Sequence, residues 1–313
     1  MIITVTLNPA LDVSCMVSEL IPNEKAYAFN EVRLAGGNGI NAARIAHRLG
    51  AEVRATGFLG GSSGNELAGI LKLEKIKHTF IPILGMTRTN VTISQEITHQ
   101  QTRLSFPGPK IISKELKALY DLILRLKPSL IVIGGSLPPG VSKIFINKLI
   151  RYYNKQGVPT LVDVPGKVLK QILNSRPYFI KPNLTEYCEL TGLKLTRMQD
   201  VLGVARKLSA SIPLQCISSV EGGALLVTPQ HAWFGKTPEL KVQSTVGAGD
   251  SMVGAIAHSL VNSKCLLNEH NCEKLLRLGL ASACATLSSE GLTMGTRASI
   301  MRFVPEITIR KVD

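Results

Sequence analysis

Aromatic residues, acidic residues and long apolar runs are all scarce in this sequence of 313 residues. Phe, Trp and Tyr make up 5% of the chain, so the basic residues are not interleaved with rings that could stack on nucleic-acid bases. No run of 18 apolar residues occurs, and the N-terminus lacks the basic region of a signal peptide. We therefore expect neither a nucleic-acid partner nor a membrane segment.

The six cysteines also lack a recognisable pattern. They form no C-x-x-C pair, and no histidine stands at zinc-ligand spacing from them. A reduced chain with buried thiols, located in the cytoplasm, is the simplest interpretation. With 45% apolar and 19% charged residues, the chain has the composition of an ordinary globular protein with a sizeable core.

Basic residues outnumber acidic ones by 36 to 22, which gives a net charge of +14. Most of the excess lies in residues 101–181, which carry 14 basic and 3 acidic side chains. Solvated outer faces of amphipathic helices are the favoured explanation, although charge alone leaves nucleic acid, a membrane surface or small anions open. The cations expected on such faces are Lys114, Lys117, Arg125, Lys127, Lys143, Lys148, Arg151 and Lys155.

Short apolar segments bounded by Gly or Pro alternate with longer segments of helical period. The alternation predicts an α/β fold with a mostly parallel sheet covered by helices on both faces. The expected strands are 2–7, 53–58, 130–133, 160–164, 179–181, 215–218 and 224–227. The expected helices are 40–49, 65–72, 113–126, 143–156, 184–191, 197–209, 249–261 and 272–287.

Residues 12–34 and 78–106 break this alternation. They contain strand-like segments at 26–34, 78–83, 90–96 and 101–106, with no helix between them. Antiparallel excursions from the main sheet would explain this pattern, and such an excursion near the carboxyl ends of the strands could close over a ligand as a lid.

The most informative motif, STVGAGDSM at residues 244–252, is a Gly-rich turn that enters an apolar-periodic helix. Backbone N–H groups of Gly247, Ala248 and Gly249 could cradle a phosphate at the helix start. Asp250 in the first turn has a plainer alternative as an acidic helix-start residue. A Walker A loop is disfavoured, because Gln230 stands where its first glycine would be.

A second Gly-rich segment, GGNGINA at residues 36–42, also opens a helix. Its G-x-G-x-x-A pattern formally matches a dinucleotide fingerprint. However, Glu52, the acidic residue at about the expected distance, begins the next strand instead of ending it. An NAD-dependent dehydrogenase is therefore a remote alternative.

Other polar residues stand where an α/β sheet binds ligands. Asn183 and Glu186 could hold a hydrated Mg²⁺, although the same spacing is a helix capping box. Ser136 and Asp12 follow predicted strands, where sugar or phosphate oxygens could be bound. Arg88 and Arg103 lie in the second excursion and could clamp a phosphate, although exposed arginines on a sheet are common.

Four motifs in this order and spacing, GGNGIN, GSLPPG, KPNxxE and STVGAGDSM, resemble the ribokinase-like (pfkB) carbohydrate kinase family. The likeness extends over essentially the whole chain and is greatest for the phosphofructokinase branch. It implies one ribokinase-like α/β kinase domain over residues 1–313, with a small β-sheet lid formed by insertions at about 12–34 and 88–106. It also implies a homodimer formed through the lid.

The resemblance further implies ATP and Mg²⁺ as cofactors and assigns roles to individual residues. Asp250 would be the catalytic base, and the amides of Gly247, Ala248 and Gly249 would form the anion hole. Residues for the sugar phosphate would be Asp12, Gly37, Gly39, Asn41, Arg88, Arg103 and Ser136. The nucleotide would be bound by Lys181, Asn183, Ser218 and Gly223, and Mg²⁺ by Glu186 through water.

Two departures from the family pattern affect the expected function. Val220 replaces the first glycine of the usual S-x-G-x-x-G nucleotide loop, and Asn38 stands where kinases of fructose 1-phosphate and tagatose 6-phosphate typically carry Lys. Together with Arg103, Asn38 favours ATP-dependent conversion of fructose 6-phosphate to fructose 1,6-bisphosphate. The alternatives are a tagatose-6-phosphate kinase, a 1-phosphofructokinase and, more distantly, a non-catalytic basic regulatory or nucleic-acid-binding protein on the same scaffold.

Overall fold

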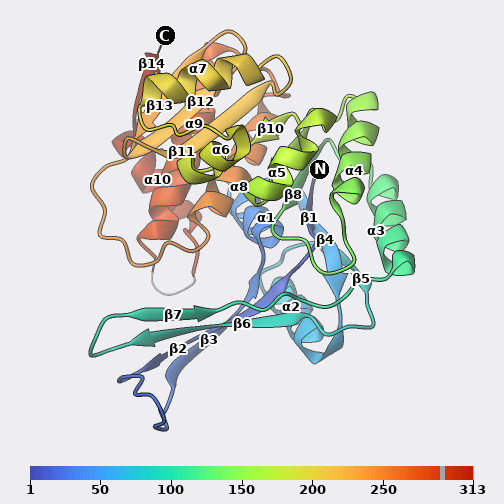
Figure 1. Cartoon of the computed structure of the whole chain (residues 1–313), viewed down its shortest axis with the longest axis vertical. Coiled ribbons are helices and arrows are strands. Elements are labelled where there is room, and N and C mark those ends of the chain that lie inside the picture. The colour runs from blue at the N-terminus through green and yellow to red at the C-terminus, as the bar shows by residue number, and fades with distance from the viewer. Residues whose placement is uncertain (290–292, 313) are drawn as a thin grey trace.

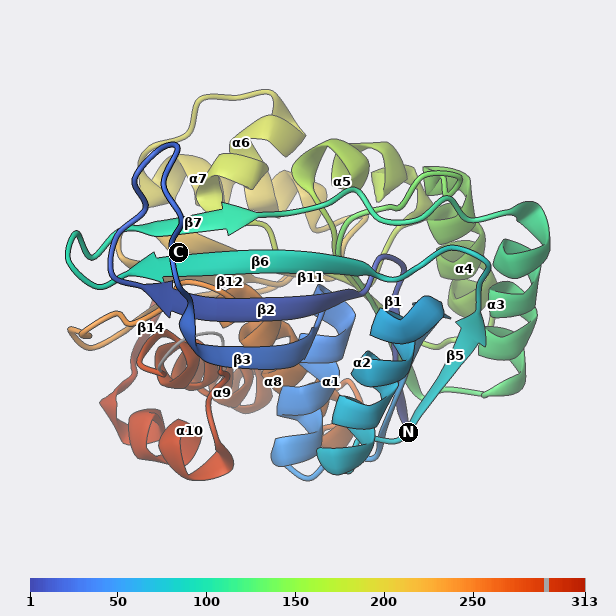
Figure 2. The same ribbon diagram turned by 90° about the horizontal axis from the view of Figure 1, so that it is seen from below.

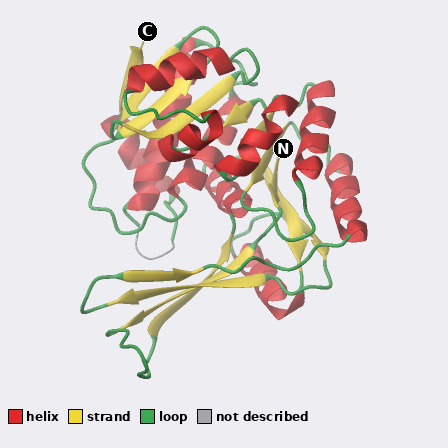
Figure 3. Ribbon diagram, in the orientation of Figure 1, coloured by secondary structure: helices red, strands yellow, loops and turns green. Residues whose placement is uncertain are grey.

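The computed structural model describes residues 1–289 and 293–312, and it contains a ten-stranded sheet with helices on both faces (Figures 1 and 3). The strand order is β14-β13-β12-β11-β10-β9-β8-β1-β4-β5. The strands are β1 (Ile2–Thr6), β4 (Val53–Leu59), β5 (His78–Pro82), β8 (Leu130–Gly134), β9 (Thr160–Asp163), β10 (Phe179–Ile180), β11 (Leu214–Val220), β12 (Gly223–Val227), β13 (Ala232–Lys236) and β14 (Thr308–Val312).

The seven strands β5, β4, β1, β8, β9, β10 and β11, which are consecutive in the sheet, run parallel. Strands β12, β13 and β14 extend the sheet in antiparallel pairs. In the centre, Thr6 of β1 lies opposite Gly57 of β4 and Gly134 of β8. The carboxyl ends of these strands therefore meet at one edge, which is the edge where parallel sheets bind ligands.

Both faces of the large sheet are buried, since every residue of the central strands β1 and β8 is buried, including the threonines of β1. Successive side chains point to opposite faces, so Ile2 packs into one core cluster and Ile3 into the other. The first cluster lies under α1 (Asn38–Arg48), α2 (Gly61–Leu73), α8 (Ala248–Asn262), α9 (Glu269–Leu287) and α10 (Arg297–Phe303). The second lies under α3 (Ser113–Arg125), α4 (Lys143–Lys155), α5 (Gly166–Ile172), α6 (Leu184–Thr191) and α7 (Met198–Leu208).

A separate four-stranded sheet, called the small sheet below, extends across one end of the large sheet (Figure 2). Its order is β3 (Phe29–Gly36), β2 (Ala10–Val17), β6 (Arg88–Gln95) and β7 (Gln101–Leu104). Strand β2 begins soon after β1 ends, and β3 leads directly into α1. The small sheet is thus joined to the molecule at the carboxyl edge of the large sheet.

The predicted fold class is confirmed: a mostly parallel sheet lies between two helix layers and is accompanied by a small sheet. One expected excursion is wrong, because the segment predicted at 78–83 contains β5, which pairs in parallel with β4 at the edge of the large sheet. The small sheet is also not wholly antiparallel, since β2 and β6 run in the same direction. Sequence periodicity missed β2, β13, β14, α5 and α10, which are short or have mixed polarity.

Seven of the eight cations predicted on helix faces lie on α3 or α4, whereas Lys127 follows the end of α3. All eight cations predicted on outer helix faces have exposed side chains. A hollow of about 650 Å³ lies between α3 and α4, and Lys117, Lys148, Arg151 and Lys155 are among its lining residues. Among the helices of residues 1–289 and 293–312, none has the length and apolar character that crossing a membrane requires.

Candidate active site

Helix α8 begins in a glycine turn at the carboxyl edge of the large sheet. Gly247 has a φ of 80°, a left-handed conformation that suits glycine, and no side chain caps the helix. A Cβ built on Gly249 would lie 3.0 Å from Nζ of Lys181. The predicted phosphate cradle, formed by Gly247, Ala248 and Gly249, thus has an ammonium group directly beside it.

Asp250 lies in the first turn of α8 and is buried, with 9% of its surface exposed. Its Oδ2 accepts a hydrogen bond of 2.7 Å from Nδ2 of Asn41 on α1. Burial, together with the negative charge of Asp163, raises the pKa of Asp250 to about 6. A carboxylate with a pKa near neutrality can accept a proton from a hydroxyl group.

Asp163 and Lys181 form a buried ion pair next to this carboxylate. Asp163 is the last residue of β9, Lys181 directly follows β10, and Nζ lies 3.5 Å from Oδ1. Burial alone would lower the pKa of Lys181, but Asp163 and Asp250 raise it above its ordinary value. Lys181 is therefore a fixed positive charge, suited to holding phosphate oxygens.

Three of the four predicted nucleotide residues, Lys181, Asn183 and Ser218, come together at the start of α6, whereas Gly223 begins β12. Asn183 and Glu186 form the capping box that was the plainer interpretation, with Oδ1 of Asn183 accepting from the amide of Glu186 and Oε2 of Glu186 accepting from the amide of Asn183. Ser218 on β11 lies beside them, because it forms a bridge with Asn183 and its amide donates to Pro182. The box uses only Oε2 of Glu186, which leaves Oε1 available for a metal contact through water.

The departure at Val220 has a clear structural basis. Val220 is fully buried at the end of β11, packed in the core cluster under α3 to α7. The left-handed conformations of this turn belong to its neighbours Ser219, Glu221 and Gly222, and Gly223 begins β12. The position of the missing glycine is therefore an extended core position, for which valine is suitable.

The start of α1 packs closely on the end of β1. Gly37 has a φ of 119°, and a Cβ on Gly39 would lie 2.5 Å from Oγ1 of Thr6 and 2.9 Å from the carbonyl oxygen of Val5. Larger residues would push the helix away from the sheet. The two glycines therefore allow Asn41, one turn into α1, to reach Asp250.

The polar residues of the small sheet face one another near its junction with the large sheet. Nδ2 of Asn90 on β6 donates to Oδ1 of Asp12 on β2, at 2.8 Å. Burial raises the pKa of Asp12, while Asn90 and the charges of Arg103 and Arg88 act in the opposite direction. The structure thus brings both predicted clamp arginines within electrostatic range of Asp12.

Arg88 is partly engaged by the backbone. Its Nη1 and Nη2 donate to the carbonyl oxygens of Phe106 and Asn8, at 2.8 and 2.9 Å, while its buried Nε has no partner among the described residues. Ser136 lies close by, since its Oγ accepts from Nδ2 of Asn8 at 3.1 Å. One donor of Arg88 and the hydroxyl of Ser136 remain suited to a further anion.

The sequence did not identify Asp163, Asn90 or Asn8 as site residues. Asp163 ends a strand that was predicted, so a carboxylate at a strand end was the available signal. Asn90 and Asn8 act through partners 78 and 128 residues away, which no local pattern reveals. In residues 1–289 and 293–312, no group of three or more His, Cys, Asp or Glu side chains could hold a metal ion.

Comparisons with known proteins agree with this geometry. Residues 6–298 match the family described as pfkB family carbohydrate kinase. The chain is 29% identical to the 1-phosphofructokinase of Bacillus subtilis over 100% of both chains. It is 32% identical to the ATP-dependent 6-phosphofructokinase isozyme 2 of Escherichia coli, over 93% of each chain. It is also 32% identical to a tagatose-6-phosphate kinase of Staphylococcus epidermidis, over 84% of this chain and 86% of that protein.

The fold is similar to that of the E. coli phosphofructokinase-2 solved in complex with substrates and products. The two structures align with a TM-score of 0.90 and 30% identity, over 97% of this chain and 98% of the other. The family match covers the glycine turn of α8, the start of α1 and the strand ends that carry Asp163 and Lys181. The chain therefore belongs to the pfkB family of carbohydrate kinases, phosphotransferases whose acceptor is a sugar hydroxyl group.

Proposed function

We propose that this protein transfers the γ-phosphoryl group of ATP to the free primary hydroxyl of a ketohexose monophosphate, and that the acceptor is fructose 6-phosphate. The observation that carries the proposal is the buried Asp250 at the start of α8, flanked by Lys181 and within electrostatic range of Arg103 of the small sheet. Asn38 supports this acceptor over fructose 1-phosphate and tagatose 6-phosphate, whose kinases typically carry Lys there. The product would be fructose 1,6-bisphosphate.

The sugar phosphate is held between the small sheet and α1 in this proposal. Asp12 and Asn41 accept and donate hydrogen bonds to sugar hydroxyls, while Gly37 and Gly39 let the backbone approach the sugar ring closely. Arg88, Arg103 and Ser136 bind the phosphate that the substrate already carries. The buried, unpartnered Nε of Arg88 supports this assignment, because an unsatisfied buried donor is costly unless a ligand supplies an acceptor.

Asp250 is the proposed base. It takes the proton of the acceptor hydroxyl as the oxygen forms a bond to the γ-phosphorus, the bond to the β-phosphate oxygen breaks, and ADP leaves. The N–H groups of Gly247, Ala248 and Gly249 and the charge of Lys181 then stabilise the negative charge on the transferred group. The proton passes from Asp250 to solvent after product release.

The nucleotide site fits ATP with Mg²⁺. Lys181, Asn183, Ser218 and Gly223 would contact the nucleotide, and Glu186 would hold Mg²⁺ through water, since its Oε1 is not used by the capping box. One carboxylate with substrate phosphates and waters is a common donor set for Mg²⁺. When bound, the ion would neutralise charge on the β- and γ-phosphates.

The small sheet is proposed as the lid of a single kinase domain and as the dimer contact. Apolar side chains on it and its loops are exposed, among them Tyr27, Val32, Ile97 and Leu104. A second copy of the sheet would remove this apolar surface from water. Val32→Glu with Leu104→Glu should lower the mass measured by light scattering from dimer to monomer. Leu73→Glu, which changes an exposed leucine on α2, is the control. A monomeric native protein would contradict the dimer.

The first experiment measures ADP release with Mg²⁺-ATP against fructose 6-phosphate, tagatose 6-phosphate, fructose 1-phosphate and free fructose, compared as kcat/KM. Fructose 6-phosphate should be preferred, and Asp250→Asn should lower kcat by at least about 10²-fold. Preference for another phosphorylated sugar would reassign the acceptor. No turnover with any of the four would reject the proposal in favour of another acceptor or a non-catalytic role. Near-normal turnover by the Asn variant would remove Asp250 from the role of base.

A further inference from the structure

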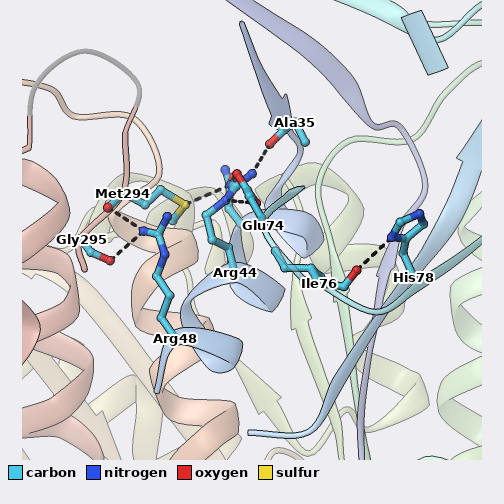
Figure 4. Close-up of polar contacts among 9 residues, drawn as sticks. Ala35, Arg44, Arg48, Glu74, Ile76, His78, Met294 and Gly295 are labelled. Carbon is cyan, nitrogen blue, oxygen red and sulfur yellow. Dashed lines mark hydrogen bonds and ion pairs between the residues drawn. The ribbon is translucent and has the colours of Figure 1, made fainter. Parts of the chain in front are cut away.

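Arg44 on α1 is a buried cation that contacts Glu74, Ala35 and Met294 from other parts of the chain (Figure 4), and Asn41 on its own helix. Its Nε donates to Oε2 of Glu74 at 2.8 Å, and its Nη2 donates to the carbonyl oxygen of Ala35 at 2.8 Å. Its Nη1 donates to Oδ1 of Asn41 at 2.8 Å and lies 3.5 Å from the sulfur of Met294. Glu74 compensates the charge, but the remaining contacts fix the guanidinium in one orientation.

The contact with Asn41 determines which end of its amide group faces the proposed base. Asn41 and Arg44 are three residues apart and therefore share a face of α1. Arg44 occupies the amide oxygen of Asn41, and the NH₂ group then donates to Asp250 at 2.7 Å. The reversed amide would place its oxygen against the carboxylate and its NH₂ group against the guanidinium, so both contacts would be repulsive.

The contact with Ala35 links this arrangement to the small sheet. Ala35 lies at the end of β3, where the strand passes into α1. The next residue, Gly36, packs so tightly on Asp12 that a Cβ there would lie 1.9 Å from its Oδ2. The same strand end therefore touches Asp12 on one side and Arg44 on the other.

This geometry rests on the proposed function of Asp250, and from it we infer that Arg44 is a positioning residue for catalysis. It keeps the NH₂ group of Asn41 directed at the Asp250 carboxylate. Through Ala35 it also fixes the position of this pair relative to the end of β3 and Asp12. Arg44 acts through Asn41 and does not itself contact the reacting atoms.

The consequence is measurable in the pH dependence of kcat. The groups that act on Asp250 are Asp163 from β9, Lys181 after β10, Arg103 from β7 and the hydrogen bond from Asn41. On the acid side of the pH profile, kcat falls as Asp250 becomes protonated; we call this part of the profile the acid limb. The hydrogen bond from Asn41 lowers the pKa of Asp250, so its loss moves the acid limb to higher pH. Loss of one hydrogen bond to a charged group corresponds to a shift of about one pH unit.

The test measures kcat and KM for ATP across pH, at saturating sugar phosphate, for Arg44→Met, Arg44→Lys and the native enzyme. Both variants should move the acid limb upward by about one unit and lower kcat about 10-fold, with KM for ATP unchanged. Arg44→Lys keeps a positive charge opposite Glu74, so it remains informative if Arg44→Met does not fold. A limb that stays in place in the folded variants would overturn the inference.

Arg48→Met is the matched control. Arg48 lies one turn further along α1 and donates to the carbonyl oxygens of Met294 and Gly295, at 2.7 and 2.9 Å (Figure 4). Its loss removes a partly buried arginine from the same region without touching Asn41. It should lower thermal stability but leave the acid limb in place. A shift equal to that of the Arg44 variants would mean that the region acts only through general stability.

A double-mutant cycle with Asn41→Ala separates positioning from a direct effect of charge. If Arg44 acts through Asn41, then Arg44→Met produces no further shift of the limb in the Asn41→Ala background. An equal shift in both backgrounds would show that the guanidinium acts on Asp250 directly and would overturn the inference. Absence of turnover by the native enzyme with all four sugars would overturn the proposed function, and near-normal turnover by Asp250→Asn would remove the base on which this inference rests. An active native enzyme whose pH profile of kcat does not move in Arg44→Met would overturn only this inference.

Discussion

Asp250→Asn should stabilise the folded protein while it removes activity. The pKa of Asp250 rises from an ordinary 3.8 to about 6, chiefly through burial and then through Asp163. Two pKa units correspond to about 3 kcal/mol at neutral pH. Because the folded pKa is the higher one, the native protein binds the proton more tightly than the unfolded chain. Its stability therefore falls as pH rises from about 4 to 6, and the Asn variant lacks this loss.

Urea unfolding of the native protein and of Asp250→Asn at two pH values tests this reasoning. The advantage of the variant should be about 3 kcal/mol at pH ~7 and about 1 kcal/mol at pH ~4.5, where the native carboxyl group is already protonated. Asp200→Asn is the control, because Asp200 is exposed and a hydrogen bond from Arg197 lowers its pKa. A variant no more stable than the native protein at pH ~7, or an advantage that does not shrink on acidification, would refute the reasoning.

Four further substitutions have expected directions. Arg88→Ala and Arg103→Ala should each raise KM for the sugar phosphate about 10-fold or more in steady-state kinetics, with little change in kcat. An unchanged KM in both variants would show that the two arginines do not bind the phosphate. Asn38→Lys should move the kcat/KM ratio about 10-fold from fructose 6-phosphate toward tagatose 6-phosphate or fructose 1-phosphate, and an unchanged ratio would dismiss Asn38 as a determinant. Gly247→Ala should cost about 1 kcal/mol in urea unfolding, because its φ of 80° disfavours a Cβ, and an unaltered midpoint would argue against that conformation.

The fold could be predicted where one interaction dominates a segment. Strands such as β1 and β8 consist mostly of Ile, Val and Leu because both of their faces are buried, so composition alone reveals them. The segment that forms β5 was assigned to the wrong sheet, because its half-buried residues also suit an excursion and only pairing with β4 distinguishes the two. β14 was missed because most of its side chains are exposed at the sheet edge.

The site could be predicted where its chemistry is local in sequence. The glycine turn before Asp250 combines a left-handed residue, a helix start and a carboxylate within a few positions. It can therefore be recognised from this short segment alone, without knowledge of its partners in the fold. The partners that tune this carboxylate could not be found in this way. Asn41 lies 209 residues from Asp250, and Asp163 becomes a neighbour only because α8 packs against β9.

Acceptor selectivity and base strength are physically connected in this site. Nδ2 of Asn38 lies 3.4 Å from Oδ2 of Asp163, whose negative charge raises the pKa of Asp250. A lysine at position 38 would place a second cation beside Asp163, in addition to Lys181, and would offset part of that negative charge. The pKa of Asp250 would then fall. A substitution at position 38 that changes acceptor selectivity therefore also changes the pH at which Asp250 loses its proton, and the two properties should change together.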